Sequence, residues 1–356
     1  MKTAIIKKDS IYIVGVGAQT PVGRSALAAA AAVRCNLAAF SDHPFMIDQH
    51  GEPMVVARAK WLAEDLPLAD RIVKLAVDAV EEALLPLAGR LSTWRSQMRV
   101  HLALSAESLP DAVRRRKVLD GVATGIKLAT ADTDVEPVVD GHAGGLLALE
   151  NACRQLRRDD TPFCLVGGAD SWLEPERLEA IDVAGRLHSR NYSWGFIPGE
   201  GAGFSLITTG ATAHRLGLIP LAELLAVATA RETKLMGTKT VCTGEGLTTA
   251  FQAVLDPTHL VSHSYCDFNG ETYRADEYGF TVCRTSECFE EAGSFTAAAE
   301  SWGDMGAASA SLALTLPVAA GTRGYARGAM NLVWSSSARG PLRGAALVNS
   351  WTGEEA

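Results

Sequence analysis

The chain has 356 residues, of which 47% are apolar and 21% charged, with a formal net charge of −8. This composition is that of a globular protein long enough for one large α/β unit or two domains, and it excludes a disordered chain. Nucleic-acid binding is also not expected, because it depends on clustered positive charge that neutralises phosphates.

The cysteines and the N-terminal residues bear on the cellular compartment. Seven cysteines form no C-x-x-C motif, and the nearest pair is Cys283 and Cys288. This pattern predicts reduced thiols and a cytoplasmic location. The first apolar run stops at Lys7, and no run of about 18 apolar residues lacks glycine, proline or charge, so neither a signal peptide nor a membrane span is predicted.

The predicted elements begin with a strand over residues 11–17, an apolar run that ends in glycines. A turn is expected at residues 20–23, with Pro21 opening a helix that continues through the alanine-rich residues 24–33. Apolar residues at helical spacing predict a longer helix over 69–87. Further along, we expect strands over 100–104, 163–166 and the end of 196–207, and a helix over 146–157.

A second series of elements follows without a low-complexity linker. We expect strands over 220–230 and 260–267, helices over 246–255 and 306–316, and a closing hairpin of 330–335 with 344–348. Strands that alternate with helices over two successive blocks predict an α/β protein with a sheet covered by helices, in duplicate and packed as one body.

The first strand also offers a weak nucleotide-binding motif. Gly15 and Gly17 match the start of G-x-G-x-x-G, but Thr20 stands where the third glycine is needed. Pro21 would also lie inside the phosphate loop. The sequence therefore predicts no cofactor.

Six short segments stand in order along nearly the whole chain. They are residues 15–23 (GVGAQTPVG), 165–170 (LVGGAD), 196–203 (FIPGEGAG), 244–247 (GEGL), 267–272 (DFNGET) and 306–308 (GAA). Together these segments resemble the β-ketoacyl synthase branch of the thiolase superfamily. The resemblance implies a duplicated five-layered αβαβα fold, with an N-terminal half over residues 1–215 and a C-terminal half over 216–356, and a dimer.

The family's condensation chemistry uses a cysteine nucleophile before a helix and two histidines that stabilise a developing enolate. This sequence differs at all three positions. His142 matches the cysteine of the family pattern C-x-S-G-L, and Asn269 matches the first histidine of H-G-T-G-T. Gly303 or Asp304 stands at the second histidine. We therefore assign His142, Asn269 and Asp304 as the degenerate triad positions.

Four further residues are expected to line the same pocket as a substrate-binding group. Arg339 replaces the second phenylalanine of the family's gating loop, and three acidic residues lie in or beside the matched motifs. Together with His142 and Asn269, two of these acids contain the residue types of a metal site, but the glycine between them favours a turn, so no metal is predicted. The three acidic residues are Glu200, Asp267 and Glu271.

Simpler interpretations remain open for each position. His142 can be a core or capping histidine, Asn269 a turn residue, and Asp304 a helix N-cap. Cys266 is expected to be an inert buried thiol, with replacement of the lost nucleophile as the alternative. The basic residues 114–117 (RRRK) are either a solvated helix face or a docking site for an acidic carrier protein.

The sequence predicts a ketosynthase-like protein that does not condense acyl groups, because loss of a covalent nucleophile typically lowers a rate by about 10⁴- to 10⁶-fold. Its expected role is an acyl-binding or partner subunit in fatty-acid or polyketide-type metabolism. The alternative is an active decarboxylase, thioesterase or acyltransferase that uses His142 and Asn269. A third interpretation is a pure interaction protein. The expected partners are an acyl carrier protein or acyl-CoA and a second subunit, identical or a synthase, with no nucleic acid and no membrane.

Overall fold

The strands of the protein form two five-stranded arrays with the same order and directions. The structure, a computed structural model, describes residues 6–89, 98–127, 135–158 and 161–350. The first array runs β5-β4-β6-β7-β1 and the second β10-β9-β11-β12-β8. The strands are β1 (Ile11–Gln19), β4 (Met98–Ser105), β5 (Val135–Asp140), β6 (Phe163–Ser171), β7 (Glu200–Thr209), β8 (Ala222–Arg231), β9 (His263–Cys266), β10 (Phe295–Ala297), β11 (Met330–Ser336) and β12 (Leu342–Ser350).

The pairing directions repeat as well. In each array the first three strands are parallel and the last two are antiparallel to their neighbours. The arrays meet where β1 and β8 pair over only three positions, from Ile11 opposite Leu224 to Ile13 opposite Ala222. This short ladder joins the arrays while each keeps its own helical covering, as an internal duplication requires.

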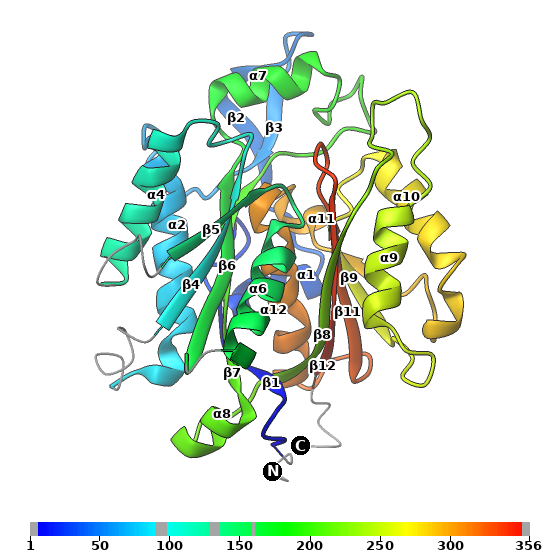
Figure 1. The fold of residues 1–356 in the computed structure, drawn as a ribbon. Coiled ribbons are helices and arrows are strands. Elements are labelled where there is room, and N and C mark those ends of the chain that lie inside the picture. The colour runs from blue at the N-terminus through cyan, green and yellow to red at the C-terminus, as the bar shows by residue number, and fades with distance from the viewer. Residues whose placement is uncertain (1–5, 90–97, 128–134, 159–160, 351–356) are drawn as a thin grey trace.

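Helices cover both outer faces and fill the space between the arrays (Figure 1). One outer helix of the first array contacts β1, β6 and β7, and the other packs on this helix and on β5. In the second array one outer helix contacts β8 and β12, and the other packs on that helix. Two of the three inner helices contact strands of both arrays and also contact each other. The result is the predicted five-layered αβαβα arrangement. The outer helices are α2 (Leu68–Ala83), α4 (Ala112–Gly125), α9 (Glu245–Val254) and α10 (Thr272–Val282), and the inner ones α1 (Ala26–Arg34), α6 (Gly144–Arg158) and α12 (Ser309–Thr322).

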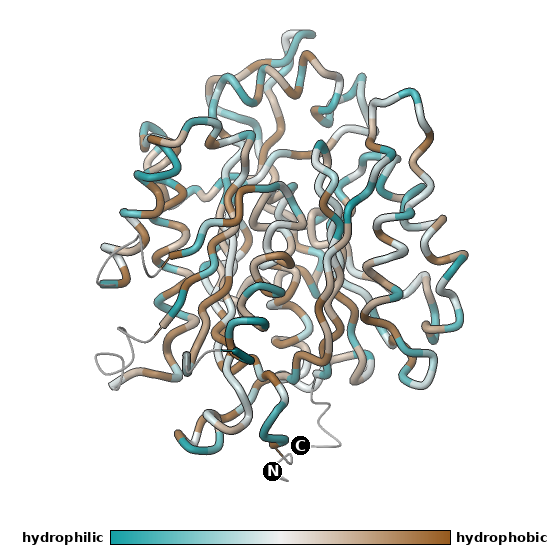
Figure 2. Tube along the Cα trace, viewed as in Figure 1, coloured by the Kyte–Doolittle hydropathy of each residue, from teal (hydrophilic) through white to brown (hydrophobic). Residues whose placement is uncertain are grey.

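Small residues allow the central layer to pack tightly. Twelve of the fourteen residues of α12 are buried, which suits a helix with apolar neighbours on every side. A Cβ atom at Gly203 of β7 would lie 2.7 Å from the backbone nitrogen of Leu312, so only glycine permits this approach. Figure 2 shows the apolar residues concentrated in the strands at the centre, with polar residues over the outer loops and helices.

Several boundaries differ from the sequence prediction. Thr20 and Gly23 close a tight turn through two backbone hydrogen bonds, and α1 begins only at Ala26, where the Ser25 side chain caps it. Pro21 therefore lies in the turn and opens no helix. The helix expected over 69–87 ends at Ala83 and is followed by the 3₁₀ turn η1 (Leu85–Leu87), and the one expected from 306 starts as η4 (Gly306–Ala308) before α12.

Some elements were not predicted. The hairpin of β2 and β3 lies under α7 at the top of the view in Figure 1. The boundary between halves at 215 and 216 stays a prediction and falls within α8. Within the described residues, no helix is long and apolar enough to cross a membrane. The additional elements are β2 (Phe40–Ile47), β3 (Pro53–Ala57), α7 (Pro175–Val183), α8 (Gly210–Leu216), η3 (Ser286–Cys288) and α11 (Ala299–Trp302).

Candidate functional site

The three residues assigned to the degenerate triad meet in one buried cluster, although each comes from a different loop. His142 lies between β5 and α6, Asn269 between β9 and α10, and Asp304 between α11 and η4. The loops of His142 and Asn269 follow the carboxyl ends of parallel strands, where α/β folds place their binding sites. Of the two residues that could match the second histidine, Asp304 faces His142 with its side chain, and Gly303 has none. The match itself stays a prediction.

Asp304 is the centre of this cluster. Nε2 of His142 lies 2.9 Å from both carboxylate oxygens of Asp304. Nδ2 of Asn269 donates to Oδ2 at 2.6 Å, and the Trp172 indole and the Gly306 amide donate to Oδ1 at 3.0 and 2.8 Å. Four donors therefore surround one carboxylate that is almost completely excluded from solvent.

This environment keeps Asp304 ionised. Burial opposes ionisation, but the adjacent His142 imidazole, the charge of Arg274 and the Gly306 amide together hold the pKa of Asp304 well below its usual range. Because a carboxylate can only accept, Nε2 of His142 carries the bonded hydrogen. The other ring nitrogen, Nδ1, is buried without a hydrogen-bond partner.

The side-chain amide of Asn269 is hydrogen-bonded to neighbouring groups. Its Nδ2 also donates to Oε2 of Glu271 at 3.1 Å, and its Oδ1 accepts the Glu271 backbone amide at 3.1 Å. Arg186 holds Glu271 from the other side through two bonds of 2.7 and 3.0 Å. The expected donor for an oxyanion is therefore already engaged with two carboxylates, and Asn269 also shapes the turn before α10.

Asp267 is tied into the same network by a different cation. Arg274 of α10, itself fully buried, lies 2.7 Å from Oδ2 of Asp267, and the Ser335 hydroxyl and Ser336 amide donate to the same oxygen. The carboxylates of Asp267, Glu271 and Asp304 thus each face a guanidinium or an imidazole. Such an arrangement disfavours a metal ion held by these residues.

The structure does not bring Glu200 or Arg339 into the hydrogen-bonded cluster. Glu200 is buried on the side of α2, where it accepts from the Ala59 amide and the Ser171 hydroxyl and lies 3.3 Å from Nε of Arg71. These contacts favour a structural role for Glu200, and its expected contact with substrate stays a prediction. The Arg339 side chain is 57% exposed and 3.9 Å from Glu107, at the rim of the cavity beside His142.

Two cavities adjoin the cluster. The one lined by His142, Trp172 and Arg339 has a volume of about 230 Å³, which is smaller than the roughly 300–1,000 Å³ of typical ligand sites. On the other side of Asn269 lies a groove of about 630 Å³. Its aromatic and aliphatic lining comes mainly from Phe40, Trp194, Ile197, Phe268 and Phe295.

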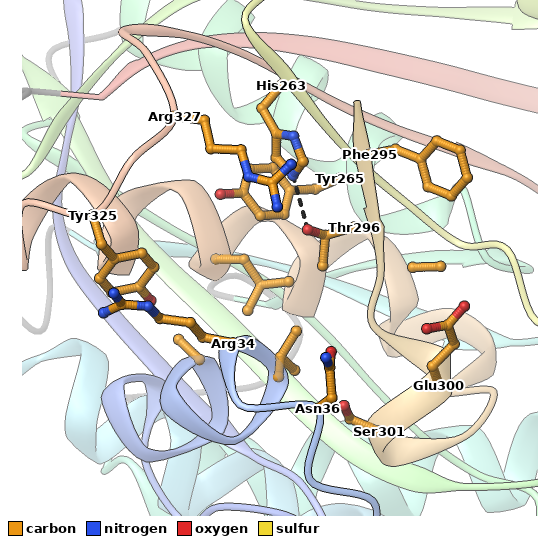
Figure 3. A pocket seen from close by; sticks show the side chains of 14 residues that line it. Arg34, Asn36, His263, Tyr265, Phe295, Thr296, Glu300, Ser301, Tyr325 and Arg327 are labelled. Atoms are coloured by element: carbon orange, nitrogen blue, oxygen red, sulfur yellow. Dashed lines mark hydrogen bonds between the residues drawn. The ribbon is translucent and has the colours of Figure 1, made fainter. Parts of the chain in front are cut away.

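A third cavity, of about 590 Å³, was not predicted and lies between α1, α12 and β10 (Figure 3). Arg34 and Arg327 line it, and the Arg34 guanidinium stacks 4.2 Å from the Tyr325 ring centroid. His263 bonds the hydroxyls of Ser294 and Thr296. Burial, with a smaller effect of Arg327, lowers the pKa of His263 to about 4, so its ring is neutral at pH 7.

Two other sequence alternatives can be placed. Burial raises the pKa of the Cys266 thiol far above its ordinary value, and the void that it shares with Asp304 measures only about 10 Å³. Cys266 therefore fits an inert thiol. The basic residues 114–117 are paired: Arg114 with Glu174, Arg116 with Asp120 and Lys117 with Asp70, while Arg115 donates to backbone carbonyls.

Sequence analysis missed three cluster residues, namely Trp172, Arg186 and Arg274. Trp172 lies two residues after the matched segment 165–170 and could have been found as the side chain after a strand end. Arg186 and Arg274 carry no such signal, because their partners are fixed only by the tertiary fold.

Comparisons with known proteins agree with this fold. A sequence model described as "Beta-ketoacyl synthase, N-terminal domain" matches residues 138–213, which include His142. None of the curated proteins matches the chain. The fold is thus the thiolase-like fold of the β-ketoacyl synthases, and the chain is ketosynthase-like.

Solved structures cover nearly the whole chain. A type II polyketide ketosynthase, described as AntDE in complex with its acyl carrier protein AntF, is 14% identical with a TM-score of 0.76, covering 97% of this chain and 100% of that one. The ishigamide ketosynthase/chain length factor is 20% identical with a TM-score of 0.73, covering 96% and 99%. The module 6 ketosynthase of the Bacillus subtilis 168 bacillaene synthase is 14% identical with a TM-score of 0.76, covering 97% and 72%.

Proposed function

We propose that this chain is a non-condensing, ketosynthase-like subunit that binds acyl groups or supports a partner synthase. One observation carries the proposal: the residues at the three condensing positions bond one another instead of facing a substrate. The Asp304 carboxylate takes up the imidazole of His142 and the amide of Asn269, and position 142 offers no thiol for an acyl chain.

The closed cluster is poorly suited to carbon–carbon bond formation. Decarboxylative condensation needs free donors for the developing enolate. Both donor groups that could serve, Nε2 of His142 and Nδ2 of Asn269, point at carboxylates instead. A carboxylate at the centre of the site would also repel an enolate.

Acyl binding is supported by the groove beside Asn269. Its volume of about 630 Å³ and its apolar lining suit an acyl chain rather than a polar metabolite. The Trp194 side chain is 71% exposed at this groove, as an apolar ligand or partner would favour.

The proposed protein partners are an acyl carrier protein and a second subunit. The similarity to a ketosynthase described in complex with its carrier protein favours the first, although the paired basic residues 114–117 do not form a free positive patch. Strand β5 ends the first array, and an open strand edge is a surface on which another chain can add a strand. We propose a dimer, with a copy of itself or with an active synthase, through this edge. The cytoplasmic location stays a prediction.

The alternative, an active decarboxylase, thioesterase or acyltransferase, is favoured by one detail. Asp304 orients the His142 ring and leaves Nδ1 unpaired, as in a histidine–carboxylate pair that accepts a proton. The adjacent cavity of about 230 Å³ leaves little room for a thioester and its carrier arm. We therefore rank this alternative second.

The test is incubation of the purified protein with malonyl-carrier protein and acyl thioesters, with mass spectrometry of the products. We expect binding of acyl thioesters without release of carbon dioxide or free acid above the rate in buffer. Trp194→Glu should weaken acyl binding, and Val183→Glu, at another exposed apolar residue outside the groove, is its matched control. Turnover that disappears in His142→Ala would reject the proposal in favour of the active enzyme.

A further inference from the structure

A second polar cluster lies in the C-terminal array, away from the residues that carry the proposed function. Glu232 follows β8, Cys242 lies in the loop before α9, and Glu277 belongs to α10. One ligand-type atom from each of the three lies within 4.8 Å of the others. The sequence offered no motif for this group, because 45 residues of chain separate its ends.

Both carboxylates are buried and prearranged. Glu232 accepts the backbone amides of Thr233, Lys234 and Gly246 at 2.9–3.0 Å, so its carboxylate is fixed beside the start of α9. Glu277 is 1% exposed, and Nε of Arg343 lies 2.5 Å from its Oε1. The three backbone amides hold the Glu232 carboxylate in place, and Arg343 holds one oxygen of Glu277.

The other oxygen of Glu277 has no explanation within the protein. Oε2 is buried, and no hydrogen-bond partner for it lies among the residues that the structure describes. A buried carboxylate oxygen without a donor is costly, since it has lost its water and gained nothing in return. Carboxylates that bind a metal ion commonly have one oxygen held by a neighbouring hydrogen-bond donor while the other oxygen bonds the metal. Glu277 has this arrangement, with Arg343 as the donor.

The charges at this place are also unbalanced. Two buried carboxylates face one buried guanidinium, that of Arg343, while the next cation, Lys234, is paired with Glu245 outside. Burial, together with the nearby Glu277 and Glu232, raises the pKa of the Cys242 thiol to about 11. The Cys242 thiol donates to the oxygen of Glu277 that Arg343 also bonds, with its Sγ 3.7 Å from Oε1.

We propose that Glu232, Cys242 and Glu277 form a binding site for a thiophilic divalent metal ion of the zinc class. On binding, the Cys242 thiol releases its proton to solvent and its sulfur bonds the metal, so that the thiolate, two carboxylates, guanidinium and divalent ion sum to zero charge. Zinc accepts sulfur and carboxylate ligands at about 2.0–2.3 Å, and water completes its coordination at three-ligand sites. The half-buried Cys242 provides the route from solvent.

Cadmium reports directly on such a site, because a cadmium–thiolate bond absorbs in the ultraviolet. Metal-stripped protein should develop this absorbance with Cd²⁺, saturating at a single equivalent, and Zn²⁺ should reverse it, whereas Mg²⁺ should not. Cys242→Ser should abolish the absorbance. Cys283→Ser, which removes an exposed thiol near the end of α10, should leave it unchanged. Glu277→Gln should weaken binding by about tenfold or more.

A second measurement needs no variant and so does not depend on the folding of Glu277→Gln. Zn²⁺ should slow alkylation of Cys242 by iodoacetamide, followed by mass spectrometry, while the exposed Cys35 and Cys283 react at unchanged rates. Absence of the cadmium absorbance in the wild-type protein, its persistence in Cys242→Ser, competition by Mg²⁺, or alkylation unaffected by Zn²⁺ would each overturn the proposal.

Discussion

The two central helices occupy matching places in the two arrays, yet their environments differ. Helix α6 follows β5, and α12 with its 3₁₀ start follows β10, so each lies between the third and fourth strands of its own array in chain order. Eight of the fifteen residues of α6 are buried, against twelve of fourteen in α12. Helix α6 thus keeps a face that is not buried, while α12 is surrounded by protein.

The residues that precede the two helices also differ. His142 precedes α6 and Asp304 precedes η4 and α12, and the two side chains bond each other across the centre of the molecule. The more buried helix carries the charged member, which gathers four donors. The comparison indicates that the start of α12 organises the cluster and that His142 is one of its partners.

The largest expected effect is on removal of the central carboxylate. Asp304→Ala should lower the free energy of unfolding by about 3–5 kcal/mol, because it leaves an imidazole and an indole buried without their acceptor. His142→Ala should cost less, about 1–3 kcal/mol, since Asp304 keeps its other donors. Urea denaturation of each variant measures both values.

The matched control for these variants is Asp120→Ala. Asp120 pairs with Arg116 on the surface, where both side chains are about half exposed, so its loss should change stability by less than about 1 kcal/mol. A larger loss of unfolding free energy in His142→Ala than in Asp304→Ala would contradict the conclusion that the start of α12 organises the cluster.

The next effect concerns the packing of the two helices. Gly203→Ala should destabilise the protein by about 1–3 kcal/mol, because the new methyl group meets the backbone of α12 at 2.7 Å. Gly144→Ala, at the start of α6, meets its nearest atom at 3.4 Å and gains helix propensity, so it should be neutral or slightly stabilising. Thermal unfolding compares them, and equal losses would show that α6 is packed as tightly as α12.

Acid should act on the cluster through Asp304. Its pKa is lowered in the folded protein, so its contribution to stability is full above the unfolded value near 4 and is lost as the pH falls further. Wild-type protein should lose at least about 1.4 kcal/mol more than Asp304→Asn between pH 5 and pH 2. Urea titrations across this range test it, and parallel curves would assign the acid sensitivity elsewhere.

His263 provides a second and separate pH window. Its folded pKa of about 4 lies below the unfolded value near 6.5, so stability from the neutral ring is full above about 6.5 and falls toward pH 4. His263→Gln should remove part of this loss of stability. It should leave unchanged the loss that Asp304 causes below its unfolded pKa.

The smallest effect is expected at the rim of the His142 cavity. Arg339→Ala should change the free energy of unfolding by less than about 0.5 kcal/mol, because the side chain is 57% exposed and its contact with Glu107 is long. A loss above about 1 kcal/mol would mean that Arg339 packs over the cavity beside α6.

The contrast between the helices also marks what the sequence could predict. The amphipathic spacing of α6 and α2 placed these helices, and the apolar runs placed β1, β6 and β11. Strand β2 was missed because its sequence, FSDHPFMI, mixes proline and polar residues without alternation, and β10 is only three residues long.

The site was predictable to the extent that its residues stand at motif positions. Those motifs placed His142, Asn269 and Asp304, which the fold brings together. They could not give the direction of a side chain, and the structure directs Glu200 to Ala59, Ser171 and Arg71 rather than to Asp304. Nor could they find Arg186, whose partner Glu271 lies 85 residues further along the chain.

The contact between His142 and Asp304 has a consequence for the evolution of the duplicated chain. Each repeat supplies one member of a hydrogen-bonded pair that neither contains alone. Separated into two polypeptides, one fragment would retain an orphan imidazole and the other an orphan carboxylate. Recombination that exchanges one repeat must therefore carry the matching side chain with it.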